Sequence, residues 1–364
     1  MMLKPLPKQT LRPPTPKTGV AKVLPIELKR SVLLGDDIFW DLDKVPNPHM
    51  VILGTSGSGK TQTLKAIVSE LFRSAPSQSI VLDFHGDQKL PGEIYFPLNM
   101  SSKHGINPLR VNLDPEGGGP KLQAIAVAAS LRRSLQLGVN QEGLLILTLE
   151  DVYGSKGITQ ANYQSWTNQP PHFGDLQDAI DTRAAGGCAD SAKLQIKMAA
   201  TFQYGVFNKP QIDLQSGKLI RIDLSKVPPE LGSIASEALL KQLMDSHRLA
   251  GEAPEIKTFV FIDEAKELKG SKLLDRITAD GRKYGFGVVL ASQRESHLSA
   301  DVLANSATKI VLAVDAADVR RVANRFRFDA GRVASLQAFQ ALVRMGQEAM
   351  TCRIQPYYLR GDGG

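Results

Sequence analysis

The feature that most constrains this sequence is an eight-residue, glycine-rich loop that starts at Gly54. The apolar run "HMVIL" leads into it, and residues 60–73 continue with a helical spacing of apolar side chains. The loop "GTSGSGKT" matches the pattern G-x-x-x-x-G-K-[ST], known as Walker A. Its glycines let backbone N–H groups turn inward, and the positive end of the following helix adds to the attraction for phosphate. The segment therefore predicts a strand, a phosphate-binding loop and a helix.

The residue types of this loop suggest how it would hold ATP and Mg²⁺. Lys60 is expected to reach the β- and γ-phosphates, and the Thr61 hydroxyl to ligate Mg²⁺. The alternative is an ordinary glycine-rich turn, but the strand-to-helix context argues against it. The predicted cofactor-binding residues are Gly54, Thr55, Ser56, Gly57, Ser58, Gly59, Lys60, Thr61 and Gln62.

A second motif, "FVFIDEA", has the form of a Walker B strand. Its apolar residues deliver Asp263 and Glu264 to a strand end. Asp263 is expected to hold Mg²⁺ through water, and Glu264 to orient and deprotonate the attacking water as a general base. Adjacent side chains on a strand point to opposite sides, so the two carboxylates can take different roles. The alternative is a strand end followed by a helix-capping Asp.

A third strand, "GVVLASQ", ends in Gln293, a candidate for sensing the γ-phosphate or the attacking water. Just before this strand, Arg282 is a candidate arginine finger that a neighbouring subunit would supply. Arg276 and Arg294 compete for that role. A surface ion pair is the alternative for each arginine, and a surface amide is the alternative for Gln293.

Composition narrows the class of protein. Of 364 residues, 42% are apolar and 22% charged, as in globular domains with an ample core. Aromatic residues amount to 6%, which disfavours a single-strand binder driven by stacking. Cys188 and Cys352 form no metal-ligand or disulfide pattern, and no stretch has the length of a membrane span or the form of a secretory signal. A cytoplasmic location is expected.

The net charge is concentrated at the N-terminus. Residues 1–30 carry +6 of the formal net charge of +7, together with six prolines. This basic arm is not expected to fold alone. It would either contact nucleic-acid phosphates or lie as a solvated tail on a neighbouring subunit.

Apolar strands that alternate with helices predict an α/β fold with a mostly parallel sheet covered on both faces. A helical stretch interrupts this pattern as an insertion, and a hairpin turning at Gly346 ends it. The expected parts are a basic Pro-rich arm (1–30), a first core part with the phosphate-binding loop (31–109), a mostly helical subdomain (110–212), and a second core part with the acidic strand, sensor strand and hairpin (213–364).

Several segments resemble one family of motor proteins. "GTSGSGKT", "FIDEA" and, more specifically, "GRKYGFGVVLASQR" and "VLANSATKI" resemble the HerA/FtsK superfamily of P-loop ATPases, and within it the HerA branch. "LDFHGD" (82–87) and "INPL" (106–109) are similar to segments of that group and of its conjugation-ATPase relatives. The resemblance covers roughly residues 30–355 and is weak across 110–212.

The resemblance implies a RecA-like core, a hexameric ring and ATP-driven movement of double-stranded DNA through its pore. The family's motifs fall on Lys60, Thr61, Asp263, Glu264 and Gln293, and on Arg282. HerA proteins carry a long β-barrel before this core, which the segment preceding the core here is too short to form. The barrel helps to dock a nuclease, so the expected nuclease or other effector partner would need another contact, such as the arm.

Other polar residues have two readings each. Lys266, Lys269 and Lys272 follow the acidic strand, and Arg321 and Arg325 lie four apart; each set would contact DNA phosphates or form a solvated face. If residues 269–272 are helical, Lys269 and Lys272 share one side.

Asp83 and His85 lie at the end of the predicted strand "SIVLDFHGD", where they would couple nucleotide state to a loop or cap a turn. The six histidines form no ligand-spaced cluster, so no metal beyond Mg²⁺ is expected.

These observations favour a ring-forming, HerA-type double-stranded DNA translocase or helicase that hydrolyses ATP between subunits. DNA processing, mobilisation and phage defence are the settings that fit it. Two alternatives remain open. One is a secretion- or conjugation-type ATPase driven by a protein partner, and the other is a nucleotide-gated scaffold that recruits an effector.

Overall fold

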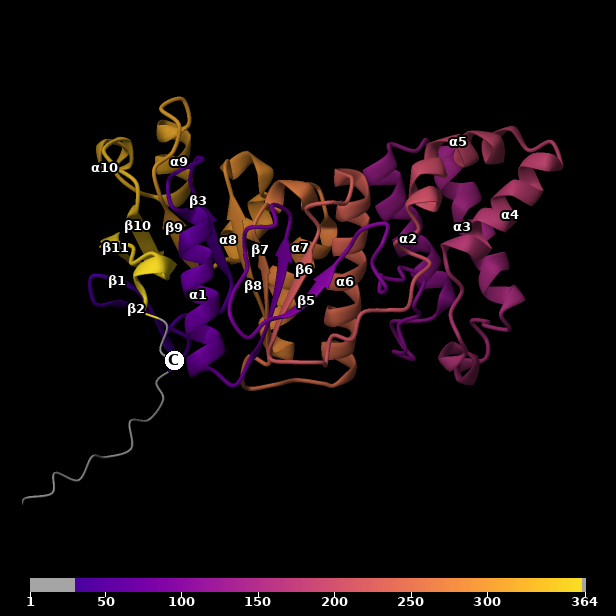
Figure 1. Ribbon diagram of the computed structural model, residues 1–364, viewed down its shortest axis with the longest axis horizontal. Helices are drawn as coiled ribbons and strands as arrows, with labels where there is room; N and C mark the ends of the chain where they lie inside the picture. The colour runs from indigo at the N-terminus through magenta and orange to yellow at the C-terminus, as the bar shows by residue number, and fades with distance from the viewer. Residues whose placement is uncertain (1–29, 362–364) are drawn as a thin grey trace, which may run out of the picture.

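A nine-stranded sheet forms the centre of the computed structural model, which describes residues 30–361 (Figure 1). The predicted arm therefore lies outside the described residues, except for Arg30. The strands of this sheet are β3 (Met50–Leu53), β4 (Gln78–Asp83), β5 (Ile94–Pro97), β6 (Leu219–Asp223), β7 (Thr258–Ile262), β8 (Phe286–Ser292), β9 (Thr308–Val311), β10 (Gln340–Met345) and β11 (Glu348–Arg353). Two further strands, β1 (Ser31–Gly35) and β2 (Ile38–Asp41), pair with each other in a separate antiparallel hairpin.

Ten α-helices lie among the described residues, with several short 3₁₀ turns. The helices are α1 (Lys60–Ser74), α2 (Pro120–Leu135), α3 (Val139–Ser155), α4 (Phe173–Ala185), α5 (Ala189–Tyr204), α6 (Pro229–Leu249), α7 (Lys272–Asp280), α8 (Ala300–Asn305), α9 (Val319–Phe326) and α10 (Ala330–Ala334). The turns that matter below are η2 (Ala265–Leu268), η3 (Gly281–Tyr284) and η5 (Tyr357–Leu359). None of the described helices is long and apolar enough to cross a bilayer.

The sheet has the order β11-β10-β9-β3-β8-β7-β4-β6-β5. All pairings from β9 to β5 are parallel, while β10 runs antiparallel to both β9 and β11. The predicted α/β class with a mostly parallel sheet is confirmed, as is the C-terminal hairpin, which turns at Gly346. β8 lies between β3, which precedes the glycine loop, and β7, which precedes Asp263 and Glu264. These two strands are therefore not neighbours.

Both faces of the sheet are covered, which explains why its strands are apolar along their whole length. Every residue of β7 and of β8 is buried. Residues such as Ile52 and Phe261 face a core shared with α1 and the β1–β2 hairpin. Their neighbours along the strands, such as Val51 and Ile262, face the core on the opposite side, which includes α6 and α7.

Helices α2 to α5 lie together beyond the sheet, next to α6 (Figure 1). Their buried residues belong to the same apolar core as the α6 side of the sheet. Phe173 and Phe207 pack with ring centroids 4.8 Å apart within it. The helical character expected between the two core parts is therefore present, and the division of the chain at residues 110 and 212 stays a prediction.

Local residue types explain several element boundaries. Helix α6 begins at Pro229, since proline suits the first turn of a helix. The edge strand β5 ends at Pro97, because an edge strand tolerates proline. Lys269 and Lys272 do not share a helical face, because Gly270, with φ of 80°, separates η2 from α7.

A buried charge network ties the far strands of the sheet together. Arg221 on β6 is 5% exposed, and its guanidinium contacts Asp83 at 3.0 Å and Glu93 at 2.8 Å. The same guanidinium lies over the Tyr95 ring, 4.4 Å from its centroid. Removing one partner of such a network leaves uncompensated charge in the interior, which is strongly destabilising.

We therefore expect Arg221→Met to lower the free energy of unfolding by about 3–5 kcal/mol, because Glu93 and Asp83 lose their cation. Urea titration followed by circular dichroism measures this change. The matched control is Arg325→Met on the exposed side of α9, which should change it by less than about 0.5 kcal/mol. A loss below about 1 kcal/mol for Arg221→Met would show that the backbone alone stabilises these carboxylates.

Candidate functional site

The carboxyl ends of four parallel strands meet at one edge of the sheet. The glycine loop follows β3, the turn that starts at Asp83 follows β4, Asp263 and Glu264 follow β7, and Gln293 follows β8. Parallel pairing of β3, β8, β7 and β4 places these ends side by side. Ligands in open α/β sheets bind at such an edge.

The glycine loop is fixed by the ends of the flanking strands. The Gly54 N–H donates to the Ser292 carbonyl at 3.2 Å, and the Thr55 N–H donates to the Ala313 carbonyl at 2.9 Å. Gly57 and Gly59 have φ of 78° and 106°, a region that favours glycine. The loop therefore depends on these glycines for its shape.

Helix α1 starts directly after this loop and leaves its positive end free to attract an anion. The first turn of α1 contains no acidic residue, and no side chain caps its N-terminus. The Lys60 Nζ donates to the Thr55 carbonyl at 3.0 Å, which turns the ammonium back over the loop. Burial lowers the pKa of Lys60, while the Glu264 carboxylate opposes that shift. A phosphate at this position would gain a charge-assisted hydrogen bond from Lys60.

A cavity of about 430 Å³ opens beside this loop. Of the predicted nucleotide-contacting residues, Gly54 and Ser58 do not line it; the Ser58 hydroxyl donates instead to the Thr55 carbonyl at 2.8 Å. The lining residues are Thr55, Ser56, Gly57, Gly59, Lys60, Thr61, Gln62, Leu64, His85, Asp87, Gln88, Asp263, Glu264, Ala291, Gln293 and Phe339.

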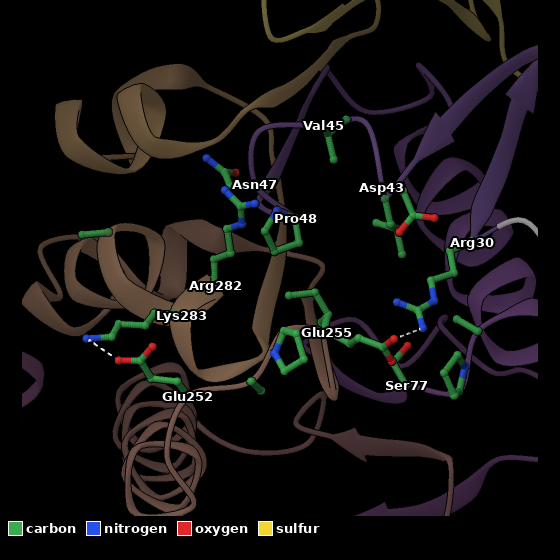
Figure 2. A pocket seen from close by; sticks show the side chains of 17 residues that line it. Arg30, Asp43, Val45, Asn47, Pro48, Ser77, Glu252, Glu255, Arg282 and Lys283 are labelled. Atoms are coloured by element: carbon green, nitrogen blue, oxygen red, sulfur yellow. Dashed lines mark ion pairs between the residues drawn. The ribbon is translucent and has the colours of Figure 1, made fainter.

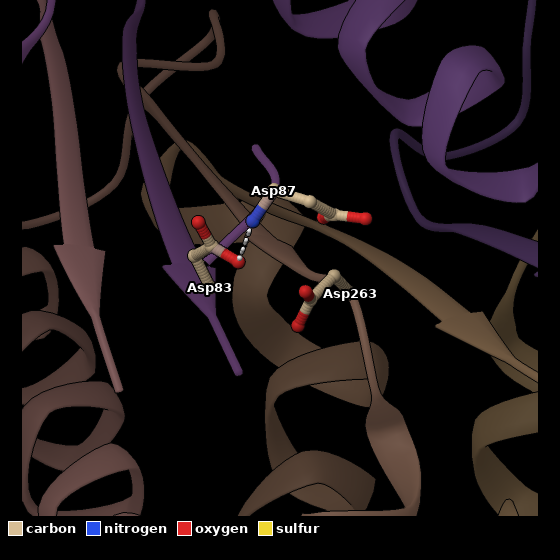
Figure 3. Close-up of side chains that lie close together, drawn as sticks. All are labelled: Asp83, Asp87 and Asp263. Carbon is tan, nitrogen blue, oxygen red and sulfur yellow. Dashed lines mark hydrogen bonds between the residues drawn. The ribbon is translucent and has the colours of Figure 1, made fainter. Parts of the chain in front are cut away.

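Three carboxylates lie close together beside this cavity, and two of them, Asp87 and Asp263, line it (Figure 3). Oxygen atoms of Asp83, Asp87 and Asp263 lie within 4.8 Å of one another. Asp83 accepts N–H groups of the turn at His85, Gly86 and Asp87, and also contacts Arg221, so it serves as the turn cap that was one of its two predicted roles.

The side-chain oxygens of Asp263, Asp87 and Thr61 are suited to bind a magnesium ion. Asp263 accepts the Phe84 N–H at 3.0 Å through one oxygen, and its other oxygen is buried with no hydrogen-bond partner among the described residues. Burial and the nearby Asp83 and Asp87 charges raise the pKa of Asp263 well above its ordinary value, so a cation would stabilise its charged form. The Thr61 hydroxyl lies 3.4 Å from the Asp87 carboxylate. Carboxylate and hydroxyl oxygens are ligands that Mg²⁺ accepts.

Glu264 lies beside this cluster with its carboxylate held in place. The Gln293 amide donates to it at 3.0 Å, and the His85 imidazole lies 3.6 Å from the same oxygen. The second oxygen of Glu264 is buried without a partner in the described part of the chain. This arrangement brings the predicted base and the predicted sensor together.

Arg282 lies far from this cavity within the chain. It belongs to η3, before the amino end of β8, whereas the loop lies at the carboxyl edge. Its guanidinium donates to the Pro46 carbonyl and lines a second cavity of about 700 Å³ (Figure 2). In the same cavity Lys283 pairs with Glu252 at 3.0 Å, and Arg30 pairs with Glu255. Of the competing arginines, Arg294 pairs with Asp318 at 3.7 Å and Arg276 is exposed.

The lining residues that were not predicted from the sequence to belong to the site are Leu64, Asp87, Gln88, Ala291 and Phe339. Asp87 lies in the segment "LDFHGD", whose second acidic residue could have been noted beside the first. Phe339 precedes β10, and no local pattern marks it.

Comparisons with known proteins find similarity to helicases. A family model described as "Helicase HerA, central domain" matches residues 35–114. A probable helicase, MJ1565, of Methanocaldococcus jannaschii is 23% identical over 293 residues, covering 76% of this chain and 54% of that protein. The DNA double-strand break repair helicase HerA of Sulfurisphaera tokodaii is 25% identical over 300 residues, covering 72% and 54%. The chain thus spans about half the length of these relatives.

Solved structures share the fold. VirB4 of Thermoanaerobacter pseudethanolicus superposes with a TM-score of 0.76 at 18% identity, covering 89% of this chain and 96% of that one. The plasmid coupling protein TrwB in complex with ADP and Mg²⁺ superposes with a TM-score of 0.63 at 16% identity, covering 90% and 89%. These likenesses confirm the predicted RecA-like P-loop fold.

The position of Asp87 leads to a test of the magnesium site. We expect Asp87→Asn to raise the Mg²⁺ concentration needed for half-maximal ATP binding about tenfold, because a carboxylate next to Thr61 and Asp263 is lost. Titrating Mg²⁺ against a fluorescent ATP analogue measures this. Asp178→Asn, on the exposed side of α4, is the control and should change nothing. An unaltered Mg²⁺ dependence in Asp87→Asn would place the metal away from this carboxylate.

Proposed function

We propose that this chain, which belongs to the HerA/FtsK superfamily of P-loop ATPases, hydrolyses ATP to move double-stranded DNA as part of a ring of identical subunits. One observation carries the proposal. Lys60, Thr61, Asp263, Glu264 and Gln293 surround a single cavity, although they come from three separate strand ends.

The chain's own residues divide the chemistry between them. Lys60 and the N–H groups at the start of α1 would bind the phosphates, and Thr61 and Asp263 would hold Mg²⁺, whose chemical contribution would be to neutralise charge on the phosphate oxygens. Glu264 takes a proton from the attacking water. Gln293, which donates to Glu264 at 3.0 Å, fixes the direction of that carboxylate and would exchange this bond for one to water or phosphate.

The location of Arg282 supports a site shared between subunits. A single chain places its glycine loop and Arg282 at opposite edges of the sheet, so Arg282 can reach a nucleotide only on another subunit. A ring, with six subunits as in the family, would bring these two edges together at each interface. A guanidinium at the γ-phosphate stabilises the charge of the transition state.

DNA is the proposed substrate because relatives over most of this chain are named as helicases. Lys266 and Lys269 are exposed next to Glu264, where a change at the nucleotide would move them. Such lysines contact phosphates without reading bases, as a motor that is indifferent to sequence requires.

The fold also supports a second candidate function. VirB4 matches over 96% of its chain, and TrwB is a conjugative coupling protein, so the same core suits an ATPase of the secretion or conjugation type. Such an ATPase would respond to a protein partner rather than to naked DNA. A nucleotide-gated scaffold that recruits an effector would bind its partner without needing hydrolysis.

DNA dependence separates these functions. We expect linear duplex DNA to stimulate ATP turnover at least about tenfold at low salt, with the stimulation fading as salt rises, because binding to phosphates releases counterions. Turnover measured with purified protein, with Lys60→Ala as the inactive control, tests this. Turnover that depends on Lys60 yet is indifferent to DNA would instead favour a protein-driven ATPase.

Subunit mixing tests the shared site. Arg282→Ala and Glu264→Gln should each reduce turnover at least about a hundredfold alone. Mixed before assembly, the two variants should regain part of the activity, because an Arg282→Ala chain keeps Glu264 and can receive Arg282 from its neighbour. Arg276→Ala is the matched control and should retain activity. Failure of every mixing ratio to restore turnover, with the variants shown to co-assemble, would count against Arg282 acting between subunits.

A further inference from the structure

An aromatic side chain from the C-terminal part of the chain lies against the glycine loop. Phe339 donates its backbone N–H to the Ser58 carbonyl at 3.0 Å and lines the same cavity as Lys60 and Thr61. A Cβ atom placed on Gly59 would lie 2.7 Å from the Phe339 ring, closer than real contacts allow. Gly59 is therefore needed for contact with this ring as well as for its own backbone conformation.

The backbone of Phe339 has an energetically unfavourable conformation. Its φ of 62° is in the left-handed region, which is uncommon for a residue of this size. Such conformations persist where surrounding contacts determine them, and they gather at ligand sites. Here the Ser58 carbonyl fixes one side of the residue, and the Ile354 N–H fixes the other by donating to the Phe339 carbonyl at 2.8 Å.

A second ring extends this surface toward solvent. Tyr358 in η5 packs edge-on against Phe339, with ring centroids 6.2 Å apart and planes at 80°. Tyr358 is 62% exposed, and so is the neighbouring Leu359. The segment thus presents two exposed and largely apolar side chains beside the cavity that Lys60, Thr61 and Phe339 line.

We infer that Phe339, with Tyr358 beside it, forms the stacking site for the purine base of the bound nucleotide. This inference rests on the proposed nucleotide-binding function. A triphosphate held at the start of α1 leaves its nucleoside at the loop, and Phe339 is the one Phe, Tyr or Trp among the residues that line the cavity. The flat face of a base packs well on such a ring.

Stacking recognises the face of a base and not its hydrogen-bonding edge. ATP and GTP are therefore expected to bind with similar affinity. Pyrimidine nucleotides, which offer a smaller face, are expected to bind more weakly. Inorganic tripolyphosphate has no base and would be held by the glycine loop and Lys60 alone.

The test compares affinities for ATP and for tripolyphosphate, both with Mg²⁺, by calorimetry on the full chain. Phe339→Ala should weaken ATP binding about tenfold and leave tripolyphosphate binding within about twofold. Phe339→Leu, which keeps an apolar group on Gly59, should lose ATP affinity in the same way, and Phe339→Trp should retain it. Tyr358→Ala, an exposed position whose change leaves the fold intact, should weaken ATP binding about threefold.

Several outcomes overturn the inference. One is an equal loss of ATP and tripolyphosphate affinity in folded Phe339→Leu, and another is ATP affinity unchanged in both Phe339→Leu and Tyr358→Ala. Wild-type protein that binds tripolyphosphate as tightly as ATP also contradicts it, since the base would then contribute nothing. Wild-type protein that binds ATP without Lys60-dependent turnover contradicts the proposed function alone, and binding of neither ligand contradicts both.

Discussion

The parallel pairing of β3, β8, β7 and β4 is the constraint on which the candidate site depends. It brings strand ends that are far apart in sequence to one edge of the sheet. Because side chains alternate along a strand, a one-residue shift of β8 against β7 would turn Gln293 away from Glu264. The fully buried residues of β7 and β8 hold this register through packing on both faces.

The electrostatics of this edge are unbalanced in a way that suits a magnesium nucleotide. Lys60 lies partly buried with a backbone carbonyl as its hydrogen-bond acceptor, and its pKa is lowered. Asp263 lies buried with one oxygen unpartnered among the described residues, and its pKa is raised. An anion would stabilise the charged form of the first and a cation that of the second. A triphosphate with its metal ion supplies both charges at once.

The carboxyl and amino edges of the sheet carry different groups, which suggests how one fold can serve proteins with different functions. The carboxyl edge carries the groups proposed for hydrolysis, while the amino edge carries Arg282 in a separate polar cavity. Helices α2 to α5 lie to one side of the sheet, next to α6 (Figure 1). A core shared by helicase relatives and by conjugation proteins leaves the identity of the cargo to surfaces outside the nucleotide site. The exposed lysines after Glu264 are proposed as one such surface.

The sequence alone determined the elements whose signal is local. Gly57, Gly59 and Lys60 identify their loop because only certain residue types allow its backbone conformation and bind phosphate. The apolar strands can be recognised in the sequence because both of their faces are buried. Tertiary structure alone decided which distant residues meet. Asp83 caps a local turn but also pairs with Arg221, more than a hundred residues away, and Phe339, which precedes the β10–β11 hairpin, packs against Gly59. Those contacts arise from strand order and long-range packing, which no short stretch of sequence encodes.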